Sequence, residues 1–194
     1  MIIKPKAEER WENILQEEID WKSVWLFNLQ AVKESKLTEF NYKLLHNLIP
    51  HRYNLYKWKL RDNPLCSFDG EIQDNVHLFV TCKKTQLFWV EFASIVYQLV
   101  NIKLDFGVAT LIKGYELKNK KYRILNLLIM YARYAIYSIF IRTESRSCVF
   151  HELGILCLFK RLICNRLEME KRCKRKNLCI FENSIVEEKI SCFV

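Results

Sequence analysis

The sequence predicts an all-α fold, an irregular multi-helix domain, and three observations favour it. Apolar residues make up 51% of the 194-residue chain and aromatic residues 13%, a composition that indicates a folded protein with a sizeable core. Only four Gly and three Pro occur, too few turn-forming residues for an all-β sandwich. Several stretches also repeat apolar residues at spacings of three and four, which is the period of an amphipathic helix.

The first two helices are expected close to the N-terminus. Residues 7–18 form an acidic amphipathic stretch that places Trp11 and Ile14 on one face. Asp20 is the expected N-cap of a second helix, because its short carboxylate can accept a hydrogen bond from a backbone N–H of the first turn. This second helix is expected to run as far as Lys33.

A third helix, a short fourth helix and a turn are expected next. Thr38 is the expected start of the third helix, and Pro50 should stop it because proline cannot continue the helical hydrogen-bond ladder. Residues 51–60 predict the short helix, and Asp-Asn-Pro at residues 62–64 predicts the turn.

Three longer helices are expected in the rest of the chain. Apolar residues at 88–99 indicate one helix, which Asp-Phe-Gly at 105–107 should break. Residues 122–142 are apolar nearly all round, and a last long helix is expected over 149–176. Residues 177–194 lack periodicity and are expected to form a flexible tail.

The expected organisation is one domain with this loosely attached tail. Residues 1–110 supply the N-terminal helices and a loop at 66–82, and residues 111–176 supply the C-terminal helical part of the same domain. Residues 124–141 are apolar enough to be tested as a membrane span. However, Arg133 at mid-span would cost about 2.5–3.5 kcal/mol on insertion, so a buried helix and no membrane partner are expected.

The loop at residues 66–82 carries the most informative pattern in the chain. It has the form Cys-x2-Asp-x7-His-x4-Cys, with Cys66, Asp69, His77 and Cys82 as candidate metal ligands. A tetrahedral zinc site needs four donors, usually thiolate sulfur and imidazole nitrogen. Three such donors are present and the fourth is a carboxylate. The sequence therefore predicts a small zinc-knuckle-like loop between helices, with zinc as its cofactor.

Further motifs surround this loop in a specific order. Phe-Asn-Tyr-Lys-Leu-Leu-His begins at residue 40, Leu-Tyr-Lys begins at residue 55, and Phe-Trp follows the loop at residues 88–89. In this order they resemble the reverse-transcriptase zinc-binding region, which lies at the C-terminal end of LINE-type non-LTR retrotransposon polyproteins. The resemblance covers residues 20–176.

The resemblance implies a non-catalytic accessory module that helps a reverse transcriptase engage RNA or DNA. It also implies a cysteine at the second ligand position, where this chain has Asp69. A carboxylate can bind zinc, but it is a harder ligand than a thiolate and weakens the preference for zinc. The alternative is that Asp69 and Gly70 are simply a turn-forming pair in a remnant that holds no metal.

Lysine and arginine are concentrated on the last expected helix, which supplies most of the net charge of +9. Such a density of positive charge suits contact with phosphates, so RNA or DNA is the expected partner. The candidate contacts are Lys160, Arg161, Arg166, Lys171, Arg172, Lys174, Arg175 and Lys176. Two alternatives stay open: a solvated basic tail, and pairing of these residues with the acidic N-terminal stretch, within the fold or in self-association.

No pattern in the sequence indicates catalysis. The chain has no adjacent Asp-Asp pair and no phosphate-binding glycine loop, and Ile155 stands where a zinc-protease motif would need a second histidine. The chain is therefore expected not to be an enzyme, and the alternative function is a helical protein-interaction domain or an inactive retroelement remnant. Met1 is followed by no export signal, so the eight cysteines are expected to stay reduced, in a nuclear or cytoplasmic protein that is not secreted.

Overall fold

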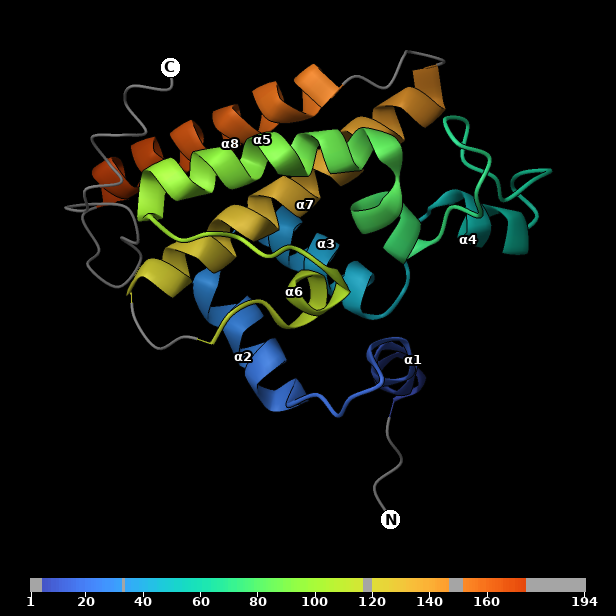
Figure 1. Ribbon diagram of the computed structural model, residues 1–194, viewed down its shortest axis with the longest axis horizontal. Coiled ribbons are helices and arrows are strands. Elements are labelled where there is room, and N and C mark those ends of the chain that lie inside the picture. The colour runs from blue at the N-terminus through green and yellow to red at the C-terminus, as the bar shows by residue number, and fades with distance from the viewer. Residues whose placement is uncertain (1–4, 33, 117–119, 147–151, 174–194) are drawn as a thin grey trace. The chain divides into compact units, whose positions relative to one another are not determined.

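The computed structural model describes residues 5–32, 34–116, 120–146 and 152–173. Within these residues the regular elements are helices, and the only β-type pairing is an isolated bridge between Leu65 and Ile72. The expected all-α fold is therefore confirmed (Figure 1). The expected tail at 177–194 lies outside the described residues.

The chain divides into two compact units. Unit 1 comprises residues 1–83 and 106–114, and unit 2 comprises residues 84–105 and 115–194. The helices of unit 1 are α1 (Lys6–Leu15), α2 (Trp21–Ala31), α3 (Ser35–Leu45), α4 (Arg52–Lys57), the π-helical turn η1 (His77–Thr81) and α6 (Val108–Lys113). Those of unit 2 are α5 (Lys83–Val100), α7 (Lys120–Arg146) and α8 (Glu152–Cys173).

The core of unit 1 joins α1, α3 and η1. Trp11 of α1 is fully buried, and its indole N–H donates a 2.9 Å hydrogen bond to the carbonyl of Leu45 at the end of α3. Phe40 of α3 meets Phe79 of η1 edge to face, with ring centroids 6.1 Å apart. Edge-to-face pairs add to the stability that burial alone provides. The π-helical turn that carries His77 therefore packs against the core of unit 1.

Acidic residues near the N-terminus have partners inside unit 1. Asp20 caps α2 as expected, accepting a hydrogen bond from the backbone N–H of Ser23. Glu12 accepts the indole N–H of Trp21 at 3.0 Å. Glu17 pairs with Lys113 of α6 at 2.9 Å. These three contacts lie within unit 1.

The third helix differs from its expected bounds at both ends. It begins at Ser35, three residues before Thr38, and the carbonyl of Glu34 accepts the first hydrogen bonds of the helix, from the N–H groups of Leu37 and Thr38 at 3.0 Å. It ends at Leu45 because Asn47 adopts a left-handed φ of 55°, which turns the chain well before Pro50. Asparagine tolerates this conformation better than most residues. The helix therefore ends through a cap and not through proline.

The break expected at residues 105–107 is present, but a short helix that was not expected follows it. Gly107 is the N-cap of α6, which buries Leu111 and Ile112. Six residues carry too little periodicity to identify a helix from sequence alone.

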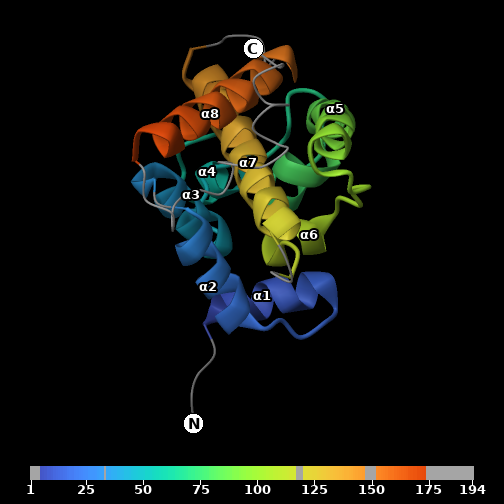
Figure 2. The same cartoon turned by 90° about the vertical axis from the view of Figure 1, so that its left-hand side faces the viewer.

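In unit 2, α5, α7 and α8 form the helical body, and Figure 2 shows α8 lying across α7. Phe88 and Phe92 of α5 both stack edge to face on Phe159 of α8, at 6.0 and 5.2 Å between centroids. On α7, the Asn126 amide bonds both the N–H and the carbonyl of Tyr115, each at 2.7 Å. A buried asparagine in a core helix is thus satisfied by the preceding loop.

Helix α7 contains one stretch, Lys121–Thr143, that is long and apolar enough to cross a membrane by length and composition. Its most apolar window is 72% buried inside the protein, as in the core helix of many soluble proteins. Arg133 in this stretch is buried as well, and burial lowers the pKa of its guanidinium to about 10.

Candidate metal centre

The four candidate ligands of the knuckle loop (residues 66–82) come together in unit 1. One donor atom from each of Cys66, Asp69, His77 and Cys82 can be chosen so that all four lie within 4.8 Å of one another. The loop contributes two donors from a tight turn and two from η1 and its C-cap. This cluster can hold a metal ion.

The tight turn is fixed by backbone hydrogen bonds around Cys66. Its N–H donates to the carbonyl of Glu71 at 2.8 Å, and its carbonyl accepts the N–H of Gly70 at 3.0 Å. Gly70 has a φ of +75°, the left-handed region that favours glycine. A Cβ at this position would meet nothing within 4 Å, so glycine is needed here for its backbone and not for space.

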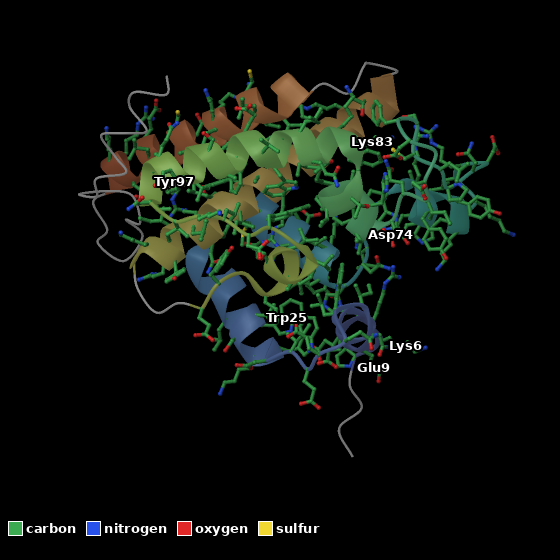
Figure 3. All side chains as sticks on the ribbon, in the orientation of Figure 1. Lys6, Glu9, Trp25, Asp74, Lys83 and Tyr97 are labelled. Atoms are coloured by element: carbon green, nitrogen blue, oxygen red, sulfur yellow. The ribbon has the colours of Figure 1, made fainter. Side chains whose placement is uncertain are left out.

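The other two donors depend on the π-helical turn η1. In an α-helix each residue rotates about 100°, so two residues five apart point about 140° away from each other. Here the N–H of Cys82 donates to the carbonyl of His77 at 2.8 Å, which is the i to i+5 bond of a π-turn. The wider turn brings a His-x4-Cys pair onto one face. Asp74 caps the turn, accepting the N–H of His77 at 2.9 Å (Asp74 and Lys83, on either side of η1, are labelled in Figure 3).

The imidazole of His77 is held between two oxygen atoms. Its Nε2 lies 3.3 Å from Oδ1 of Asp69, and its Nδ1 lies 3.4 Å from the hydroxyl of Thr81. Histidines that ligate metals usually bond a second group through the other ring nitrogen, which fixes the tautomer. Thr81 fits that role, although its residue type did not mark it in the sequence.

The carboxylate of Asp69 is also oriented by the backbone. Oδ1 accepts the N–H of Glu71 at 3.4 Å, and Oδ2 accepts the N–H of Lys83, the first residue of α5, at 3.5 Å. The side chain is only 4% exposed and that of His77 only 7%. Cys66 and Cys82 are buried too. All four donors are therefore shielded from water.

The protonation of the metal-free cluster follows from this burial and proximity. A hydrogen bond with Cys82, together with burial, raises the pKa of the Cys66 thiol to about 12. Burial alone would lower the pKa of His77, but the hydrogen bond with Cys66 and the charge of Asp69 outweigh it and raise the pKa above its usual value of 6.5. A divalent cation entering the cluster would therefore displace protons from sulfur and nitrogen.

The candidate phosphate contacts on α8 do not share one environment. Arg166 is buried, and its Nε donates to the carboxylate of Glu170 at 2.7 Å, so Arg166 is not available to a surface ligand. The exposed candidates are Arg161, Lys171 and Arg172, while Lys160 is half-buried. Lys174, Arg175 and Lys176 lie outside the described residues.

Other residues weighed in the sequence lie outside the cluster. His51 is fully buried, and its Nδ1 accepts the backbone N–H of Asn54 at 3.2 Å, which is a structural role. His46 stacks on Tyr42 with centroids 4.2 Å apart. On α8, Cys157 is exposed and Cys164 is half-buried.

No family model, no curated protein and no solved structure matches this chain. The resemblance to the reverse-transcriptase zinc-binding region therefore depends on the motifs alone and stays a prediction. The geometry itself defines a coarser class of site: a buried cluster of two cysteines, a histidine and an aspartate that can hold a metal ion.

Proposed function

We propose that the chain is a non-catalytic nucleic-acid-binding module whose unit 1 holds a structural zinc ion. The observation that carries the zinc assignment is the convergence of the four buried donor atoms within 4.8 Å. In a zinc tetrahedron, bonds of about 2.0–2.3 Å place neighbouring ligand atoms about 3.3–3.8 Å apart. The separation of 3.3 Å between Nε2 of His77 and Oδ1 of Asp69 has the length of one such edge.

The donor chemistry favours zinc over harder cations. Two thiolates and an imidazole select zinc and related soft metals, whereas magnesium and calcium prefer shells built only from oxygen. The single carboxylate weakens this preference without reversing it. All four positions of a tetrahedron are filled by the protein, so the site has no open position for substrate, and this supports a structural role.

A metal here would join two segments of unit 1 that side-chain contacts already bring together. Cys66 and Asp69 lie on the turn, whereas His77 and Cys82 lie on η1 and its C-cap. A divalent cation would replace the thiol protons and bind both segments at once. Binding energy at such a site is folding energy.

Metal analysis of the reduced, purified protein tests this proposal. We expect one zinc per chain, and removal by a chelator should lower the midpoint of thermal unfolding. Cys66→Ser and Cys82→Ser should each abolish stoichiometric zinc, while Cys157→Ser, which changes an exposed thiol outside the cluster, should leave it unchanged. A wild-type chain without zinc, and unaffected by chelator, would contradict the metal assignment.

Nucleic-acid binding is supported by the net charge of +9 and by the exposed Arg161, Lys171 and Arg172 of α8. Neutralising phosphates with basic side chains releases counterions, so affinity should fall steeply as salt rises. Titration of labelled RNA and DNA at two salt concentrations measures this slope. A chain with neither zinc nor salt-dependent binding would instead fit a helical interaction domain or an inactive remnant.

A further inference from the structure

We infer that the C-terminal end of α4 and the chain just after it form a binding surface for single-stranded nucleic acid. The surface, called the α4 surface below, consists of Tyr56, Lys57, Trp58, Lys59, Leu60 and Arg61, which are all exposed. The inference deepens the proposed function by naming the form of nucleic acid and its site, and it depends on that function only for the partner class. None of these residues belongs to the basic set on α8.

Large apolar side chains on this surface are left in water. Tyr56 and Trp58 are each 46% exposed, and Leu60 is 67% exposed. Phe68 and Ile72 of the knuckle loop are exposed as well, at 39% and 54%. Single exposed apolar residues are ordinary, but a run of them within one short segment marks an interaction site.

Basic and apolar residues alternate along the α4 surface. Lys57, Lys59 and Arg61 stand between Tyr56, Trp58 and Leu60, and no acidic residue interrupts them. An apolar protein-docking patch would hold its charges at the rim, because charged residues are depleted at the centre of such interfaces. A polyanion with stacking bases fits the alternation better: phosphates meet the cations and bases meet the rings.

One contact shows that cations and rings are already placed together here. Nζ of Lys57 lies 4.5 Å from the centroid of the Tyr53 ring, within the range of a cation–π interaction. Stacking needs bases whose faces are free, which single strands offer and duplexes do not. We therefore expect a single-stranded ligand.

The backbone at Lys59 ends α4. The N–H of Lys59 bonds the carbonyl of Tyr56 and the N–H of Leu60 bonds that of Leu55, the paired bonds of a Schellman motif at the end of α4. Lys59 occupies its left-handed position with φ +61°, where glycine is the usual residue. Gln16 after α1 and Asn47 after α3 adopt the same conformation, so at Lys59 it marks the end of the helix.

The α4 surface is positioned by the knuckle loop. Nη1 of Arg52, on the first turn of α4, donates to the carbonyl of Leu65 at 2.8 Å. The backbone N–H of Tyr53 donates to the carbonyl of Gln73 at 3.0 Å. In Figure 1, α4 and the loop that follows it lie together, as these contacts require. These contacts join α4 to the loop that carries the candidate metal ligands.

Fluorescence anisotropy with labelled 20-nucleotide RNA, DNA and duplex DNA on the full-length chain tests the inference. Tyr56→Ala and Trp58→Ala should each weaken single-strand binding by roughly five- to a hundredfold, the range found when one stacking residue is removed. Tyr97→Ala, which truncates an exposed aromatic side chain on α5, is the matched control and should leave affinity unchanged.

Lys59→Gly gives a sharper test because two readouts should move in opposite directions. Glycine removes one positive charge but relieves the left-handed backbone, so the midpoint of urea unfolding should rise while affinity and the salt slope fall. If Lys59 had only a structural role, Lys59→Gly would raise the stability of the protein and leave its affinity for single-stranded nucleic acid unchanged. That result would overturn its part in the surface.

Zinc content measured on the same samples separates this inference from the metal assignment. Weakened binding in variants that keep the wild-type zinc content supports the surface. Single-strand binding that needs Tyr56 and Trp58 in a chain without zinc would keep the surface and reject the metal. Tighter binding of duplex than of single strands, or self-association that Trp58→Ala abolishes with no effect on nucleic acid, would overturn the surface.

Discussion

Nε2 of His77 and Oδ1 of Asp69 lie 3.3 Å apart in a place where both side chains are almost fully buried. The same Oδ1 accepts the backbone N–H of Glu71 at 3.4 Å, a bond typical of an aspartate in a turn. Asp69 therefore combines the two roles that its sequence position left open: it shapes the turn and faces the other donors. Substitutions at position 69 separate these two roles.

Asp69→Cys should raise the affinity for zinc by about tenfold or more, because a thiolate is a softer ligand than a carboxylate. Asp69→Asn keeps the turn-forming side chain but removes its charge, so it should lower the affinity. Competition with a chromophoric chelator measures both variants. Equal affinities in wild type and both variants would mean that Asp69 is only a turn residue.

Gly70→Ala should destabilise the protein by about 1 kcal/mol or more, because alanine is strained at a φ of +75°. Gly107→Ala is the control: its φ is −153° and its Cβ position is equally open, so alanine fits there without strain. Urea unfolding compares the two. A similar change in stability for both variants would contradict the backbone explanation.

His51 should make stability depend on pH. Burial lowers the pKa of His51 from 6.5 to about 4, and its Nε2 has no hydrogen-bond partner among the described residues. Between these two pKa values the unfolded chain binds a proton that the folded chain does not. This stabilising contribution is complete above pH 6.5 and falls by about 1.4 kcal/mol per unit as the pH drops towards 4.

Urea unfolding of chelator-treated protein across this pH range measures the effect of His51. His51→Gln should flatten the dependence, whereas His46→Gln, at a histidine that is not buried, should retain it. Identical pH profiles for wild type and His51→Gln would show that His51 is not responsible.

Glu170→Ala should destabilise the protein by about 3–5 kcal/mol, because it removes the buried carboxylate that pairs with the buried guanidinium of Arg166 at 2.7 Å. Glu168→Ala makes the same substitution on the same helix, at an exposed pair with Arg172 whose atoms lie 3.5 Å apart. It should cost no more than about 1 kcal/mol. Thermal unfolding of the two variants tests the difference, and comparable losses would argue against a structural role for Arg166.

Much of the fold and the ligand set could be predicted because each depends on local sequence. Asp20 and Asp74 each cap a helical segment by accepting a hydrogen bond from the backbone N–H three residues later, so both caps depend on nearby sequence alone. The meeting of Cys66, His77 and Cys82 follows from ligand spacing. By contrast, no residue pattern in the sequence indicates the π-turn that aligns His77 with Cys82. The contact between the Thr81 hydroxyl and the His77 imidazole depends on that turn, so it could not be predicted either.

Tertiary contacts explain most of what the sequence could not show. Arg166 looked like one more surface cation, and only its burial with Glu170 removed it from the candidate phosphate contacts. The sequence shows basic and apolar residues alternating from Tyr56 to Arg61. Whether these side chains are exposed decides whether they can bind a ligand, and so short a segment is too short for helical periodicity to indicate exposure.

Zinc K-edge X-ray absorption of the reduced protein, loaded with one equivalent of zinc, tests the central claim most directly. We predict that zinc has two sulfur ligands at about 2.3 Å and two nitrogen or oxygen ligands at about 2.0–2.2 Å. Zinc bound by nitrogen and oxygen ligands alone, or zinc that is lost on washing as readily as from an unfolded control, would contradict this prediction.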